Sequence, residues 1–155
     1  MNTHEFDRLL EFLSPYPIEV QELALAARAA ALPMFEHVSE IFWDATQAVC
    51  LGFTFTHSTK ENFFNFAVYA NHVTLIFPWG IKLVDTEKRL KGEGNQVRNL
   101  RLLSIEMLND PYVLDLIKQA EAIAVKPAEP LLSIQIVRVM NGPKRRPNPN
   151  GNKES

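Results

Sequence analysis

The sequence predicts an α+β fold, a two-layer sandwich in which a mostly antiparallel sheet of about five strands is packed by N-terminal and C-terminal helices. Apolar residues recur at helical spacing near both ends of the chain, whereas β-branched and aromatic residues fill its middle. Helices grouped around a strand-rich centre are typical of α+β proteins rather than alternating α/β proteins. The 155 residues, 46% of them apolar, suit one domain, which we expect over residues 1–140.

Two helices are expected at the N-terminus. The first begins near Asn2 or Thr3, and its apolar stripe consists of Phe6, Leu9, Leu10 and Leu13. Two prolines interrupt the chain, and the second of them, Pro17, suits the first turn of another helix. That second helix is predicted over residues 18–32 and is rich in alanine, which lets neighbouring elements approach closely.

The middle of the chain predicts strands over residues 49–56, 63–69 and 72–77. Only Ala70 and Asn71 separate the last two runs, which is the connection of a tight hairpin. Residues 40–43 are expected to add a short strand, and residues 97–103 another. In the predicted strand over 63–69, the consecutive residues Phe63 and Phe64 should point to opposite faces of the sheet.

A third helix is predicted to begin at Asp110, because an N-cap acid is followed there by Pro111 at the first helical position. Lys126-Pro127 should end it. Apolar and polar residues then alternate over residues 132–136, which predicts a last strand.

The C-terminal segment 141–155 is expected to be a disordered basic tail, because its prolines and glycines accompany almost no apolar residue. Its charged residues are Lys144, Arg145, Arg146, Lys153 and Glu154. Two interpretations are open: a solvated tail, or a weak contact with an anionic partner or with the protein's own acidic face.

Composition excludes several functional classes. The chain has 16 Lys and Arg against 18 Asp and Glu, so it lacks the overall positive charge of a nucleic-acid-binding protein, and we expect no nucleic-acid partner. No run of 18 apolar residues predicts a membrane span, and the N-terminus does not resemble a signal peptide. With a single cysteine, Cys50, the chain suits a reducing compartment, so the expected location is cytoplasmic without a membrane partner.

No pattern predicts a catalytic site or a cofactor. The four histidines lack the spacing of metal ligands, and Cys50 lies in an apolar run where a thiol is usually inert. Gly92-Glu93-Gly94 carries an acid that would repel phosphate. We therefore expect a protein without a cofactor and without a catalytic residue, and an enzyme with an unrecognised site stays open.

Carboxylates offer one alternative. Asp7 and Glu11 share a face of the first helix, and Glu19 and Glu22 share a face of the second. Clustered carboxylates can hold a cation weakly, although a solvated helix face explains the same pattern.

Aromatic and basic residues supply the ligand-binding candidates. Most of the ten phenylalanines lie between residues 42 and 77. Core packing explains this best, while a ligand groove or a homodimer surface is left open. The candidate ligand-binding residues are Trp43, Tyr69, Trp79, Lys82, Arg98 and Arg101. The two arginines should point to opposite faces of their strand.

The chain resembles the DUF1801, or YdhG-like, family from residue 62 to about residue 120. The residues that carry the resemblance are the hairpin over 66–77 (FAVYANHVTLIF), Gly80-Ile81-Lys82-Leu83, Leu90-Lys91-Gly92-Glu93-Gly94 and the run over 96–102 (QVRNLRL). The basic run Pro143-Lys144-Arg145-Arg146-Pro147 is similar to the end of longer members. The chain departs from the family pattern at Asn71, where lysine is common, and at Cys50-Leu51-Gly52-Phe53, where relatives have Tyr-Gly-Met-Pro.

The resemblance implies a compact α+β sandwich and, since the family has no established function, little about activity. Some members are labelled frataxin-like iron chaperones. The preferred hypothesis is a non-enzymatic binding or interaction domain for an unknown small molecule or protein. The alternative is an iron-binding chaperone using surface carboxylates.

Overall fold

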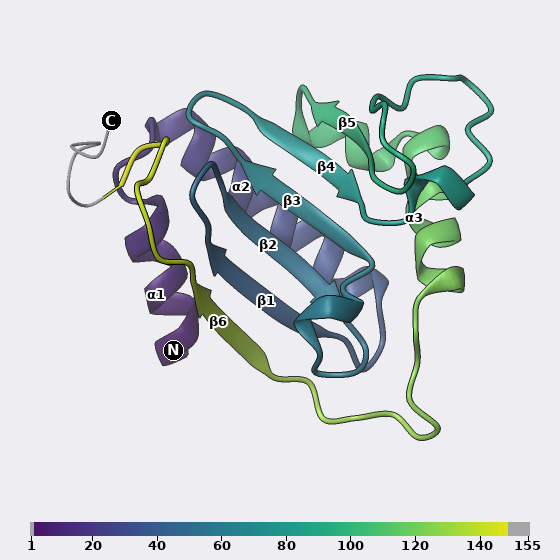
Figure 1. Ribbon diagram of the computed structural model, residues 1–155, viewed down its shortest axis with the longest axis horizontal. Helices are drawn as coiled ribbons and strands as arrows, with labels where there is room; N and C mark the ends of the chain where they lie inside the picture. Colours follow the sequence, from purple (N-terminus) through teal and green to yellow (C-terminus); the bar gives the residue numbers. More distant parts are fainter. Residues whose placement is uncertain (1, 149–155) are drawn as a thin grey trace.

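A computed structural model describes residues 2–148 as an α+β fold with one mostly antiparallel sheet (Figure 1). In the described chain the sheet has six strands: β1 (Ser39–Asp44), β2 (Val49–Thr54), β3 (Phe64–Val68), β4 (Val73–Phe77), β5 (Arg98–Leu102) and β6 (Gln135–Val139). Their order is β5-β4-β3-β2-β1-β6, and every neighbouring pair is antiparallel except β1 and β6. The predicted fold class is therefore confirmed.

The helices are α1 (His4–Leu13), α2 (Ile18–Ala31) and α3 (Pro111–Ile123), close to their predicted ranges. Thr3 caps α1 by accepting a hydrogen bond from the Phe6 N–H, and Asp110 caps α3 by accepting from the Tyr112 N–H. Within residues 2–148, no helix has the length and apolar character that crossing a membrane requires.

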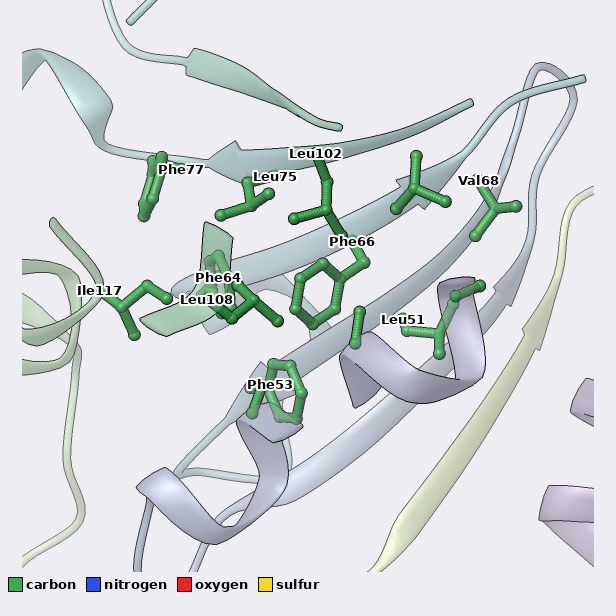
Figure 2. Close-up of a cluster of buried hydrophobic side chains, with 14 of the residues drawn as sticks. Leu51, Phe53, Phe64, Phe66, Val68, Leu75, Phe77, Leu102, Leu108 and Ile117 are labelled. Carbon is green, nitrogen blue, oxygen red and sulfur yellow. The ribbon is translucent and has the colours of Figure 1, made fainter. Parts of the chain in front are cut away.

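The core lies between the sheet and the helices, and Figure 1 shows α2 crossing behind the sheet. Side chains alternate along each strand, so the strands send one set of large apolar side chains toward the helices. Figure 2 shows this cluster, which includes Leu51, Phe53, Phe64, Phe66 and Leu75. The stacked and edge-to-face rings of Phe53, Phe64 and Phe66 fill its centre.

Among residues 2–148, no α-helix covers the opposite face of the sheet (Figure 1). The strand register places Gly52, Asn65, Ala67 and Thr74 along its middle, together with the buried Ile41. The register places Gly52 opposite Asn65, and a Cβ on Gly52 would lie 2.3 Å from the Asn65 Oδ1 atom. Glycine is therefore required at position 52. Any side chain there would collide with the buried Asn65 side chain when β2 and β3 pair. We call this surface the open face.

Two strand predictions need correction. Phe63 lies just before β3, where its ring stacks on Phe55 at 4.7 Å, so Phe63 and Phe64 are both buried and Phe63 is not turned onto the open face. The last strand begins at Gln135 instead of residue 132, because it pairs in parallel with β1, and Leu132 is 82% exposed. The alternation of apolar and polar residues over 132–136 therefore does not correspond to one buried and one exposed face of a strand.

Residues 141–148 lie against the end of β1, contrary to the expectation of a disordered tail. The Arg146 side chain is fully buried, makes an ion pair with Asp44 and donates from its Nε atom to the Ala45 carbonyl at 2.9 Å. The rest of the predicted tail, residues 149–155, lies outside the described residues.

Candidate functional site

A pocket of about 310 Å³ lies where three distant parts of the chain meet. Its wall residues come from the β2–β3 connection, from the end of β4 and the turn after it, and from the end of α3. The apolar part of the lining consists of Phe63, Phe77, Trp79, Leu83, Ala120, Ile123, Ala124 and Val125, and the polar part of Lys60, Glu61, Asn62 and Lys82. The volume is at the lower end of the range for small-molecule sites.

The turn after β4 positions two of the predicted ligand-binding residues, Trp79 and Lys82. β4 ends at Phe77, and a short 3₁₀ helix spans Gly80–Lys82. This turn packs tightly on β5, since a Cβ on Gly80 would lie 2.8 Å from the Arg98 backbone nitrogen. The Lys82 ammonium group consequently lies 4.5 Å from the centre of the Trp79 ring.

The β2–β3 connection forms the facing wall. A 3₁₀ helix over Thr59–Glu61 places Lys60 and Glu61 at the pocket. The Glu61 carboxylate accepts a hydrogen bond of 2.6 Å from the Thr56 hydroxyl, which holds this acid within its own loop. The Asn62 side chain donates to the Thr59 carbonyl at 2.8 Å.

The charged residues of the pocket lining are Lys60, Lys82 and Glu61. In the part of the chain that the structure describes, neither Lys60 nor Lys82 makes an ion pair with a carboxylate. Both side chains are exposed at the rim, and Trp79, 44% exposed, stands beside Lys82 above an apolar floor. This arrangement can bind a flat apolar group and an anionic group at the same time.

Arg98, a third candidate from the sequence, lies outside the pocket. Its guanidinium group donates from Nη1 to the carbonyls of Gly94 at 2.7 Å and Val97 at 2.8 Å. It is therefore engaged in holding the 94–97 loop against β5.

The other three candidates, Trp43, Tyr69 and Arg101, belong to the open face. One row of that face crosses all six strands and contains Arg138, Trp43, Cys50, Ala67, Thr74 and Arg101. Trp43 and Arg101 are four strands apart, or roughly 19 Å at the usual strand spacing of about 4.8 Å. They cannot hold one small ligand together.

The pKa values of two residues on the open face, Cys50 and His72, are shifted toward the uncharged form. Burial raises the pKa of Cys50 to about 11, which makes its thiol a poor nucleophile at neutral pH. Burial and the nearby Arg101 charge lower the pKa of His72, whose ring stacks on Tyr69 at 5.0 Å.

The acidic candidates do not assemble into a centre. Asp7 and Glu11 lie on the exposed side of α1, with the Glu11 carboxylate 3.9 Å from the Arg8 guanidinium, while Glu19 and Glu22 are exposed on α2. Over residues 2–148, no group of three or more His, Cys, Asp or Glu side chains could hold a metal ion.

Sequence reasoning missed the pocket residues Lys60, Phe63 and Ile123. Lys60 lies in a connection and Ile123 at the end of a helix, and no spacing along the chain relates either of them to Trp79. The exposure of Ile123 and Val125, two apolar residues at and just after the end of α3, is visible only in the structure.

Comparison of the chain with protein-family models, with curated proteins and with solved structures found no match.

Proposed function

We propose that the protein is a non-enzymatic binding domain that takes a small organic anion with a flat apolar body into the pocket beside Trp79. The observation that carries this proposal is the pairing of Lys82 with Trp79 at the rim of an apolar pocket. We also propose that the chain is related to the DUF1801 proteins that it resembles, and that it is located in the cytoplasm.

The ligand class follows from the chemistry of the lining. Phe63 and Phe77 are buried in the floor, and Trp79 offers an exposed ring face, so a flat apolar group gains contact area there. Lys60 and Lys82 place two cations at the rim, and a carboxylate or sulfonate can accept charge-assisted hydrogen bonds from them. The lining carries these two cations against the single carboxylate of Glu61, so an anion is favoured over an organic cation.

Fluorescence titration with anilinonaphthalene sulfonate, a flat apolar anion, tests the proposal. We expect saturable binding to the folded wild-type protein, and Lys82→Met should weaken it about tenfold by removing the cation while keeping the apolar stem. Trp79→Leu should weaken it further by removing the ring face. The near-ultraviolet circular dichroism of each protein establishes that the dye binds a folded state.

Lys88→Met is the matched control, because Lys88 is an exposed lysine outside the pocket. Its affinity for the dye should equal that of the wild type. Equal binding by wild type, Lys82→Met and Trp79→Leu would refute the assignment of the pocket, and so would a lack of saturable binding.

A further inference from the structure

The two edges of the sheet differ in how their backbone groups are satisfied. At the β5 edge, Asn99 directs its backbone groups outward and exchanges two hydrogen bonds with Lys91, at 2.8 Å and 2.9 Å. The loop before β5 therefore covers that edge. An exposed strand edge is a ready template for pairing with another chain, so such a cover has a protective effect.

The β6 edge has no such cover within residues 2–148. The hydrogen bonds from the Glu40 N–H to the Ile134 carbonyl and from the Met140 N–H to the Asp44 carbonyl fix the direction of the parallel ladder. The backbone N–H and carbonyl groups of the even-numbered residues of β6 consequently point toward β1. The N–H groups of Gln135, Val137 and Val139 point away from the sheet. Within residues 2–148, the Val137 carbonyl accepts only one hydrogen bond, of 3.3 Å, from the Nη1 atom of the neighbouring Arg138 side chain.

Exposed apolar side chains gather along the same segment. Among residues 132–140, Leu132, Ile134, Val139 and Met140 are all exposed. Natural edge strands are usually guarded by proline, lysine or an inward charge. β6 carries only Arg138, whose register with Trp43 turns it onto the open face.

We propose that β6 pairs with β6 of a second copy of this chain, antiparallel and with Val137 on the twofold axis. In this register Gln135 lies opposite Val139 of the other copy, and these outward-facing residues exchange backbone hydrogen bonds. Ile134 lies opposite Met140, so two exposed apolar side chains cover each other across the junction.

Charge repulsion favours the register centred on Val137 over the register shifted by one residue. Centring the pair on Arg138 would place two guanidinium groups directly opposite each other, which is unfavourable. Centring it on Val137 places each Arg138 opposite Ile136. A twofold axis perpendicular to the sheet also brings the two α1 helices to the same face of the joined sheet, since α1 packs beneath β6 and β1.

One strand pair buries less area than a standard interface, so the dimer should be weak and form in the micromolar range. The dimer edge and the pocket involve different residues, so the pairing stands independently of the proposed ligand site. Lys82→Met should dimerise as the wild type does.

Sedimentation velocity at protein concentrations from about 1 to 500 μM tests the pairing. The wild type should pass from monomer to dimer over this range. Val137→Pro removes an outward N–H that the β1–β6 ladder does not use, and proline is tolerated at such edge positions. This variant should remain monomeric while keeping its circular dichroism spectrum.

Val139→Lys provides a second variant in case proline disturbs the fold, and Val84→Lys at another exposed valine is its control. We expect Val139→Lys to raise the dissociation constant at least tenfold and Val84→Lys to leave it unchanged. A wild type that stays monomeric throughout overturns the proposal. A folded Val137→Pro variant that still dimerises, or a folded Val139→Lys variant with the dissociation constant of the wild type, overturns it as well.

Discussion

At the scale of single residues, the guanidinium group of Arg146 is held in place by three contacts. Its Nε donates to the Ala45 carbonyl at 2.9 Å, its Nη1 donates to the Pro147 carbonyl at 2.8 Å, and its Nη2 pairs with Asp44. Asp44 also lies 3.5 Å from the Lys144 ammonium group. The planar guanidinium group suits such a buried site, because Asp44 compensates its charge while Nε and Nη1 donate to backbone carbonyls.

Arg146→Ala should lower the free energy of unfolding by roughly 3 kcal/mol, because it breaks a buried ion pair and leaves Asp44 with less compensation. Urea denaturation monitored by circular dichroism measures this change. Arg145→Ala is the control, since the exposed Arg145 side chain should contribute no more than about 0.5 kcal/mol. Equal stability of wild type and Arg146→Ala would mean that the segment 141–148 does not anchor the fold in solution.

At the scale of elements, a hydrogen-bonded cluster fastens the loop after β4 to the start of α3. Asp85 accepts hydrogen bonds from the Tyr112 hydroxyl, from the Leu90 N–H at 3.0 Å and from the Arg89 N–H at 3.3 Å. Partial burial acts to raise the pKa of Asp85, but these hydrogen bonds outweigh it and hold the pKa below its ordinary value. Burial and the same bond to Asp85 raise the pKa of Tyr112 to about 12.

A lowered carboxylate pKa stabilises the folded state above the unfolded value of 3.8, and this stabilisation is lost as the pH falls through the folded value. Tyr112→Phe removes one of the bonds that lower the pKa. We expect the variant to be less stable than the wild type at neutral pH, and the difference to shrink as the pH falls below 3.8. Urea denaturation as a function of pH measures both curves.

Tyr69→Phe is the matched control, because no hydrogen bond from the Tyr69 hydroxyl is present among the described residues. Its stability relative to the wild type should not change between neutral and acidic pH. A difference between wild type and Tyr112→Phe that stays constant into strong acid would contradict the role given to Asp85.

The elements also show what the sequence could predict. Helix starts depend on local chemistry, so the expected starts near Asn2 or Thr3 and at Asp110 agree with those of α1 and α3. The position of β6 depends on its parallel partner β1, about ninety residues earlier in the chain, and the local alternation over 132–136 misplaced it. Arg146 was assigned to a disordered tail for the same reason, because its partner Asp44 is equally remote in sequence.

At the scale of the whole molecule, the sheet separates three surfaces. The pocket lies at the end of β4 and α3, the open face carries Trp43 and Arg101, and the β6 edge lies at the far side of the strand order. Of six ligand-binding candidates from the sequence, Trp79 and Lys82 meet in the pocket, and the others do not join them. The amino-acid type alone could identify aromatic and basic residues as ligand-binding candidates. Only the fold shows whether each of them lies at the pocket or on the open face.

Nuclear magnetic resonance titration of the labelled protein with naphthoate, a flat aromatic carboxylate, tests the central claim most directly. We expect backbone and indole signals to shift around Lys60, Phe63, Trp79, Lys82 and Val125, while those of Trp43 and Arg101 stay in place. Shifts confined to the open face, or no saturable shift at the pocket, would contradict it.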